Sequence, residues 1–163
     1  MTKFREILLE FNQLGIEFVI IGGVAARIHG SSYVTDDLDV CYARSEENLR
    51  KISDWLEGHH ASLRGAPANL PFVPDVNTLR AGSNFTFLTD VGNVDFLGEV
   101  QPIGFYPTVL QHSFSVEVFG IQCRIIDIDT LIQIKKIISR AKDTVVALEL
   151  EAIKELERRK RDK

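Results

Sequence analysis

The chain has 163 residues, of which 45% are hydrophobic and 26% are charged, and its net charge at pH 7 is −4. This length predicts one domain with a sizeable buried core, and the composition excludes a largely disordered chain. The negative net charge argues against binding of nucleic acid by bulk electrostatic attraction, and the basic run at 154–163 predicts a solvated helix end.

Helices and strands alternate in the first third of the chain. Apolar residues recur at helical spacing up to Gly15, and a later apolar run ends at Gly22-Gly23, which predicts a turn. An acidic alternation then predicts a second strand, and Ser45 opens another helix. The predicted elements are a helix over 2–14, a strand over 17–21, a short helix over 24–29, a strand over 37–43 and a helix over 45–57.

The rest of the chain predicts pairs of strands followed by a helical end. Residues 61–83 and 98–113 are rich in proline and glycine and predict loops, the first with room for one strand and the second with a helical turn. From Thr130 the apolar residues step by three and four, which predicts a helical face that is either core or a partner seam. Strands are predicted over 84–89, 94–97, 114–118 and 122–126, with turns at Gly92-Asn93 and Gly120.

Three features bear on the compartment. The first thirteen residues are amphipathic and charged, and they lack the apolar core of a signal peptide. The longest apolar stretch, near 18–28, contains glycine and arginine and is too short to span a bilayer. Cys41 and Cys123 lie in apolar runs without a Cys-x-x-Cys pair, which favours buried, reduced thiols over a zinc site. We therefore expect a cytoplasmic protein with no membrane partner.

The strand at 37–43 begins with two carboxylates on one face. Side chains alternate along a strand, so Asp37 and Asp39 point one way and Leu38 and Val40 point the other. Two carboxylates whose Cα atoms lie about 7 Å apart need cations or water. They are either solvated groups at a strand end or ligands of a hard cation such as Mg²⁺, which takes carboxylate and phosphate oxygens.

The glycine pair upstream adds a second chemical feature. Gly22 and Gly23 end a strand and precede a helix, where glycine lets the backbone approach a ligand and helix N–H groups attract phosphate. The pair is alternatively a plain turn, and it is not a Walker loop because no Gly-Lys-Ser/Thr follows. Together with the two carboxylates, it suggests metal-assisted phosphoryl or nucleotidyl transfer.

The combined order of motifs resembles a known superfamily. Gly22-Gly23, thirteen intervening residues and Asp37-Leu38-Asp39-Val40 are similar to the signature of nucleotidyltransferases with the DNA-polymerase-beta-like fold, and Asp95 in Val-Asp-Phe-Leu matches its third acidic residue. The resemblance implies an α/β (α+β) fold with a mixed twisted sheet, flanking helices and a C-terminal helix or helix pair. It also implies a single domain over 1–163, with a catalytic core at about 17–129 and a helical segment over 130–160.

A subgroup resemblance is more detailed. Small nucleotidyltransferases of abortive-infection and toxin–antitoxin systems often carry Gly-Gly-x-Ala, then His-Gly, then Thr-x-Asp-x-Asp. Two positions depart from the subgroup: Tyr33 replaces an arginine, which removes a bidentate phosphate ligand, and Ala141 replaces a proline, which predicts a more continuous helix. The matching residues are Gly22, Gly23, Ala25, His29, Gly30, Thr35, Asp37 and Asp39.

The resemblance assigns roles to residues of this chain. It implies that Asp37, Asp39 and Asp95 hold Mg²⁺ or Mn²⁺, with a nucleoside triphosphate as the substrate. Thr35 either hydrogen-bonds the nucleotide-binding loop or is purely structural. The resemblance also implies that Gly22 and Gly23 hold the outgoing phosphates. It implies that Lys142, with Lys135 or Arg140, neutralises the charge of the triphosphate. These three basic residues are alternatively a solvated basic face.

Two classes of function remain open at this point. The first is an enzyme that moves a nucleoside monophosphate from the triphosphate to a hydroxyl of a protein, an RNA end or a small molecule. The second is a catalytically weak binding module with the same fold, such as an antitoxin-like partner or a subunit of a larger complex. The second hypothesis rests on the short chain, which leaves room for little beyond the catalytic core.

Overall fold

Seven helices and nine strands make up the computed structural model, which describes residues 1–163. The strands are β1 (Phe18–Ile21), β2 (Asp37–Tyr42), β3 (Ser62–Leu63), β4 (Asn84–Thr89), β5 (Gly92–Leu97), β6 (Glu99–Val100), β7 (Gly104–Phe105), β8 (Ser113–Val118) and β9 (Ile121–Ile126). The helices are α1 (Phe4–Leu14), α2 (Gly22–Ile28), α3 (Glu46–Gly58), α4 (Val76–Ala81), α5 (Tyr106–Gln111), α6 (Ile128–Ile138) and α7 (Ala141–Arg161).

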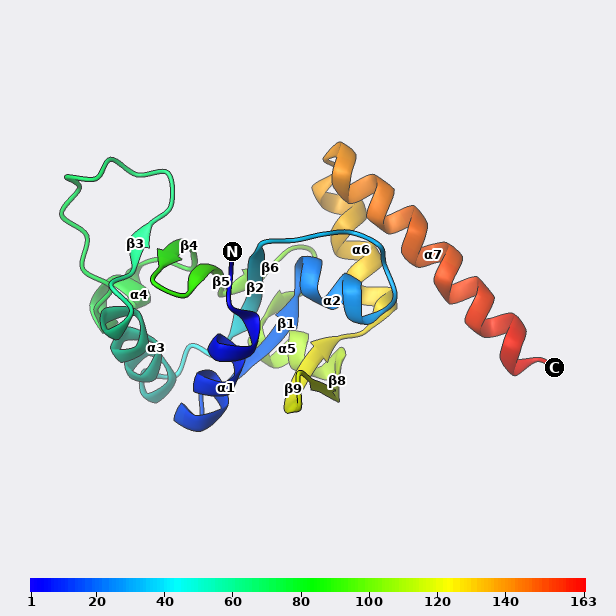
Figure 1. Ribbon diagram of the computed structural model, residues 1–163, viewed down its shortest axis with the longest axis horizontal. Coiled ribbons are helices and arrows are strands. Elements are labelled where there is room, and N and C mark those ends of the chain that lie inside the picture. Colours follow the sequence, from blue (N-terminus) through cyan, green and yellow to red (C-terminus); the bar gives the residue numbers. More distant parts are fainter.

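The large sheet has seven strands in the order β3-β4-β5-β2-β1-β9-β8, and β6 and β7 form a separate pair. Near its centre, β2 runs parallel to β5 and antiparallel to β1, and β1 runs parallel to β9. Helices α3 and α4 lie toward one end of this sheet, and α6 and α7 lie toward the other (Figure 1). The predicted fold class, a mixed sheet with flanking helices and a C-terminal helix pair, is confirmed.

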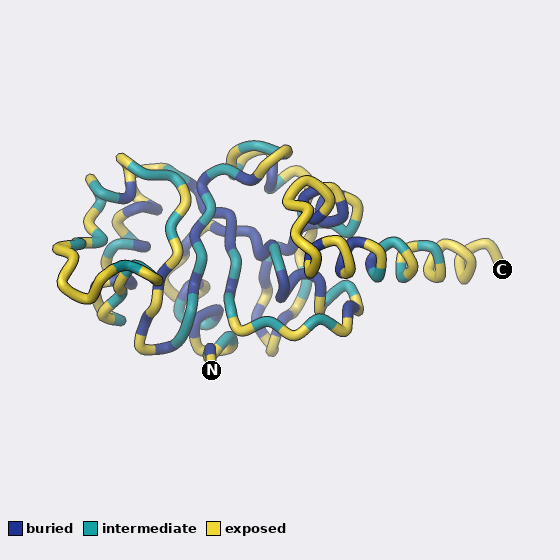
Figure 2. The backbone as a smooth tube through the Cα atoms, turned by 90° about the horizontal axis from the view of Figure 1, so that it is seen from above, coloured by how far each residue is buried: buried dark blue, intermediate teal, exposed yellow.

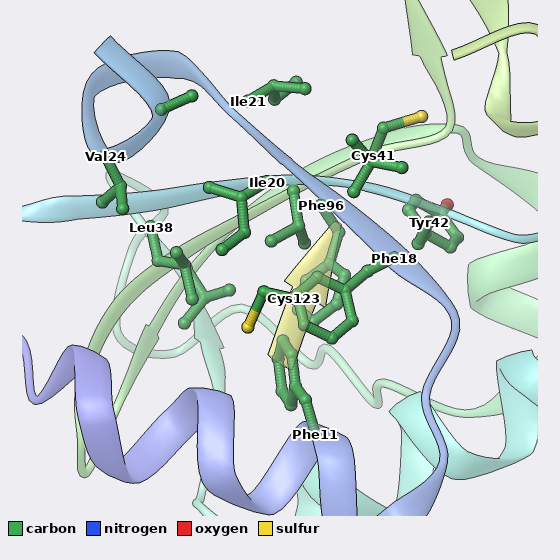
Figure 3. Packing of buried hydrophobic residues seen from close by; sticks show 14 of the residues in the cluster. Phe11, Phe18, Ile20, Ile21, Val24, Leu38, Cys41, Tyr42, Phe96 and Cys123 are labelled. Atoms are coloured by element: carbon green, nitrogen blue, oxygen red, sulfur yellow. The ribbon is translucent and has the colours of Figure 1, made fainter. Parts of the chain in front are cut away.

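Buried residues cover both faces of the central sheet, since all four residues of β1 are buried. On the face that α1 covers, the ring of Phe11 lies 5.3 Å from that of Phe18 (Figure 3) and 4.9 Å from that of Trp55. Full burial of each such side chain contributes roughly 1.5–3 kcal/mol to stability. This packing fixes β1 and β2, whose other ends carry the polar residues of interest.

Both cysteines belong to the buried hydrophobic cluster. Cys41 and Cys123 are free and buried, as the sequence predicts. Burial raises the pKa of the Cys41 thiol to about 12 and that of Cys123 to about 11. Because the thiolate is the reactive form, neither side chain is a nucleophile at neutral pH.

Two predicted turns are instead parts of regular elements. Gly22 and Gly23 are the first residues of α2, because a φ of +69° at Gly22 lets the chain pass directly from strand to helix. Gly92-Asn93 opens β5, so the hairpin turn lies two residues earlier. The loop predicted over 61–83 contains α4 as well as the short strand β3, since Asp75 caps a helix by accepting a hydrogen bond from the Thr78 N–H.

The continuous helix predicted from Ala141 is wrong. Ser139 has a φ of 55° and Arg140 is extended, so α6 ends and α7 turns back against it. The inner side of α7 is buried through Val146 and Leu150, whereas its outer side, predicted as core or a partner seam, is largely exposed (Figure 2). None of the seven helices combines the length and apolar character that crossing a membrane requires.

Candidate active site

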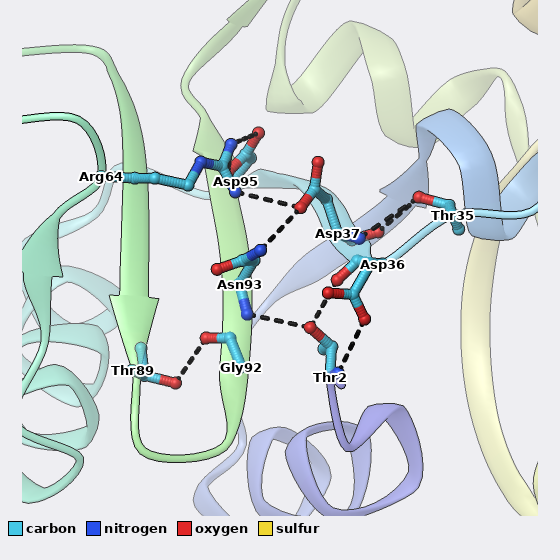
Figure 4. A network of polar contacts seen from close by, with 9 residues as sticks. All are labelled: Thr2, Thr35, Asp36, Asp37, Arg64, Thr89, Gly92, Asn93 and Asp95. Atoms are coloured by element: carbon cyan, nitrogen blue, oxygen red, sulfur yellow. Dashed lines mark hydrogen bonds and ion pairs between the residues drawn. The ribbon is translucent and has the colours of Figure 1, made fainter.

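Two neighbouring strands bring the predicted carboxylates together. β2 presents Asp37 and Asp39 on one face, while Leu38 and Val40 are fully buried on the other, as the alternation predicts. β5 lies parallel beside it, with Asp95 in register with Asp39 and Asn93 in register with Asp37. Hydrogen-bonded strands lie about 4.8 Å apart, so the backbone register fixes this spacing. We call Asp37, Asp39 and Asp95 the carboxylate cluster (Figure 4 shows Asp37 and Asp95).

The glycine pair packs directly against this cluster. A Cβ atom on Gly22 would lie 2.2 Å from Asp39 Oδ2, and one on Gly23 would lie 2.6 Å from Thr35 Cβ. Any side chain at either position would therefore displace a residue of the site. Thr35 in turn accepts a hydrogen bond from the Asp37 N–H at 3.3 Å, so it supports the start of β2.

The pKa values of two carboxyls reflect partial burial. The pKa of Asp39 is raised to about 6, first by burial and then by the charge of Asp95, while a Gly23 N–H and the charge of Lys135 act in the opposite direction. Burial also raises the pKa of Asp95, and the neighbouring Arg64 only partly offsets it. Strongly shifted carboxyls that share a cleft are typical of functional sites.

Helices α6 and α7 and the residue between them supply a cluster of basic side chains near the carboxylate cluster. Lys135 is only 8% exposed and donates to Asp143 Oδ1 at 2.8 Å, and Arg140 Nε donates to Asp143 Oδ2 at 2.6 Å. Burial alone would raise the pKa of Asp143, but its hydrogen bonds with these two cations hold that pKa below its ordinary value. Lys142 lies beside them and is exposed. We call Lys135, Arg140 and Lys142 the basic cluster.

One cavity of about 450 Å³ unites these groups. The structure brings all seven predicted site residues to its lining, together with both other basic residues and Tyr33, which supplies no charge there. The cavity is also lined by Asn84 and Phe85, from the predicted strand over 84–89, and by Glu99 and Gln101, from the predicted loop over 98–113. The predicted residues in the lining are Gly22, Gly23, Thr35, Asp37, Asp39, Asp95 and Lys142.

Sequence reasoning missed Arg64, which makes the strongest contacts to the carboxylate cluster. Its guanidinium donates to Asp95 Oδ1 and Oδ2 at 2.8 and 2.9 Å and to Asp37 Oδ1 at 3.1 Å (Figure 4). Asn93 donates to the same oxygen of Asp37 at 3.0 Å. Arg64 follows the two-residue strand β3 in a segment without periodicity, so no signal in the sequence marks it.

Comparisons with solved structures identify the fold. The lincosamide antibiotic adenylyltransferase LnuA, solved with lincomycin, matches with a TM-score of 0.61 over 92% of this chain and 95% of that chain, at 12% sequence identity. ANT(2″)-Ia, solved in complex with adenylyl-2″-tobramycin, matches with a TM-score of 0.57 over 98% of this chain and 95% of that chain, at 13% identity. A protein of Thermotoga maritima assigned as a nucleotidyltransferase matches with a TM-score of 0.56 over 91% and 94%, at 14% identity.

This chain has the nucleotidyltransferase fold. The resemblance inferred from the glycine pair and the three acidic residues is therefore confirmed at the level of the fold. No family model matches the chain, and no curated protein matches it in sequence.

The carboxylate cluster has the oxygen atoms that a hard divalent cation needs, but its side chains do not converge on a single point. Three carboxylates on two adjacent strands supply the oxygens that Mg²⁺ and Mn²⁺ prefer, and the raised pKa of Asp39 marks a buried carboxylate short of compensating positive charge. No three acidic, histidine or cysteine side chains converge closely enough to hold a metal ion. Arg64 occupies the oxygens of two of the three carboxylates instead.

Proposed function

We propose that this protein transfers a nucleoside monophosphate from a nucleoside triphosphate to a hydroxyl group. The proposal is carried by one observation: the carboxylate cluster, the basic cluster and the glycine pair line the same cavity. In the reaction, the acceptor oxygen forms a bond to the α-phosphorus, the bond between the α- and β-phosphates breaks, and pyrophosphate leaves. The adenylyltransferase neighbours LnuA and ANT(2″)-Ia support this class of reaction for the fold.

The carboxylate cluster would bind the divalent cation and orient the acceptor. Asp37, Asp39 and Asp95 are the residues that would hold Mg²⁺ or Mn²⁺. When bound there, the cation would neutralise phosphate charge and lower the pKa of the acceptor hydroxyl. Asp95, which is 13% exposed on the cavity side of β5, would lie nearest to the acceptor and take up its proton.

The basic cluster would hold the triphosphate on the other side of the cavity. Lys135 and Arg140 are both anchored by Asp143, so their charges are placed before the substrate arrives. Lys142 is free to reach outward to the leaving pyrophosphate. The backbone at Gly22 and Gly23, which no side chain shields, would approach the phosphates closely. Thr35 would act indirectly, by supporting Gly23 and the start of β2.

A label-transfer experiment tests this function. Purified protein would be incubated with each α-³²P nucleoside triphosphate, with Mg²⁺ or Mn²⁺, and with cell extract, RNA and hydroxyl-bearing small molecules as separate acceptors. We expect label on one acceptor class and a loss of about a thousandfold or more in Asp39→Asn, because a metal ligand is removed. Asp36→Asn is the matched control, since Asp36 is exposed and its carboxylate accepts a hydrogen bond from the Thr2 N–H, away from the cavity. Transfer by the wild type that persists in Asp39→Asn would refute the assigned site.

The second candidate function is a binding module with little catalysis, in which the chain partners a toxin-like protein or a larger transferase. The exposed outer side of α7 favours it, because Val145 and Leu148 are 65% and 61% exposed on one side of that helix. Absence of label transfer with any acceptor, together with metal-dependent nucleotide binding that Asp37→Ala abolishes, would favour this candidate over the enzyme.

A further inference from the structure

We infer that Arg64 is a displaceable internal cation, which occupies the carboxylate cluster in the metal-free protein and leaves when a divalent cation binds. This inference rests on the proposed function only for the identity of the site. It goes beyond that function because it assigns Arg64 a control over metal loading that neither the acidic motif nor the fold implies.

The contacts of Arg64 compete directly with metal coordination. Its guanidinium uses both oxygens of Asp95 and one oxygen of Asp37, whereas Asp39 makes no contact with it. Each of these carboxylate oxygens gives one of its lone-pair positions to the guanidinium, which leaves fewer positions for a cation in the cavity. The positive charge of Arg64 also repels a divalent ion at the same position. Arg64 at this position therefore opposes metal binding through all three carboxylates, and its departure would favour that binding.

The attachment of Arg64 to the rest of the protein allows this movement. β3, which precedes it, pairs with β4 at only two positions on the edge of the sheet, and the Arg64 N–H donates to Thr86 O at 2.9 Å. Gly65 follows with a φ of +80° and with open space around the position of its absent side chain. The Arg64 side chain is itself 31% exposed, so part of it already lies at the protein surface.

An arginine suits this role because of its geometry. The guanidinium has donors on separate nitrogens, so Nη2 contacts both oxygens of Asp95 while Nη1 donates to Asp37 Oδ1. Its positive charge therefore balances the negative charges of Asp37 and Asp95, on two adjacent strands, when no metal is present. Lysine is a point charge and would bridge them less well.

The test measures binding of Mn²⁺ alone, without nucleotide or acceptor, by isothermal titration calorimetry. We expect Arg64→Gln to bind Mn²⁺ about tenfold more tightly than the wild type, as loss of a competing bidentate ion pair predicts, and Arg64→Lys to lie between them. Arg80→Gln is the matched control, because Arg80 pairs with Glu46 outside the cavity, and its affinity should equal that of the wild type. Unchanged or weaker Mn²⁺ binding in Arg64→Gln, or no binding by either protein, would overturn the inference.

A second measurement follows the arginine itself in the unmodified chain. Trypsin cleaves after arginine, and the ion pairs hold Arg64 in the cavity. We expect Mn²⁺ to accelerate cleavage of the Arg64–Gly65 bond severalfold, with cleavage after Arg80 as the internal reference, both followed by mass spectrometry. Equal acceleration at both bonds, or none at Arg64, would count against displacement.

These outcomes separate the inference from the proposed function. Tighter Mn²⁺ binding by Arg64→Gln in a protein that transfers no label would leave the inference intact and refute the enzyme. Label transfer by a protein whose Mn²⁺ affinity does not depend on Arg64 would refute the inference and leave the enzyme intact.

Discussion

The carboxylate cluster and the basic cluster face the same cavity but are positioned by different means. Asp37, Asp39 and Asp95 project from two paired strands, so backbone hydrogen bonds set their spacing. Lys135 and Arg140 come from either side of a helix break, and one buried carboxylate, Asp143, holds both. The first arrangement should survive changes of side chain. The second should fail when a single residue is changed.

Asp143 gives the largest expected effect on stability. Asp143→Asn leaves the buried Lys135 without its hydrogen-bonded counter-charge, and removal of one partner from a buried ion pair costs about 3–5 kcal/mol. We therefore expect a large fall in the free energy of unfolding, measured by urea denaturation, together with weaker triphosphate binding. Asp129→Asn is the control on the same helix pair, because Asp129 contacts Lys154 in an exposed ion pair. A loss below about 1 kcal/mol for Asp143→Asn, typical of exposed pairs, would show that the basic cluster does not depend on it.

Gly22 tests the backbone support of the carboxylate cluster. Gly22→Ala forces an alanine into left-handed backbone geometry, at about 1–2 kcal/mol, and also drives Cβ into Asp39. We expect a total loss of about 2–4 kcal/mol in thermal or urea unfolding. Gly65→Ala separates the two causes, since Gly65 has a φ of +80° but nothing within 4 Å of a Cβ atom. Equal losses for the two variants would mean that the contact with Asp39 has no cost.

The pH dependence of stability tests the burial of Asp39. The pKa of Asp39 is about 6 in the folded protein against an ordinary 3.8, so the folded state holds this proton more tightly than the unfolded state does. The free energy of unfolding contributed by this group must then fall as pH rises from about 4 to about 6. In metal-free buffer, Asp39→Asn should be about 1–3 kcal/mol more stable than the wild type at pH 7 and no more stable at pH 4. A stability difference that is constant between these two pH values would contradict the assigned burial.

The contrast between the clusters also explains what the sequence could predict. Asp37 and Asp39 alternate with buried residues on one strand, and strand alternation is a local rule that needs no knowledge of the fold. Asp95 and the glycine pair could be added because their order along the chain resembles that of a known superfamily. Each of these predictions depends on backbone periodicity or on chain order.

Other parts of the site depend on side-chain contacts between distant segments. Arg64 reaches the cluster from a short edge strand in a segment that predicted only a loop, and no local pattern indicates its direction. Asp143 is 1% exposed and anchors Lys135, but no pattern in the sequence distinguishes it from a solvated carboxylate next to Lys142. The helix break at Ser139 was missed because the apolar spacing continues across it, and the continuous helix expected from Ala141 does not form.

The exposed outer side of α7 provides the smallest expected effect, and the buried inner side of the same helix serves as its comparison. Leu150 is fully buried, and Leu150→Ala should cost about 2–5 kcal/mol. Leu148 is 61% exposed, and Leu148→Ala should change the unfolding free energy by less than about 0.5 kcal/mol. Both variants would be measured by urea denaturation at several protein concentrations. A loss for Leu148→Ala comparable to that for Leu150→Ala, and larger at higher protein concentration, would mean that another copy of the chain covers the outer side of α7. In that case self-association would stabilise the helix that carries part of the basic cluster. The position of the basic cluster would then depend on a contact between two chains as well as on the contact with Asp143, whereas the carboxylate cluster would still depend on strand pairing within one chain.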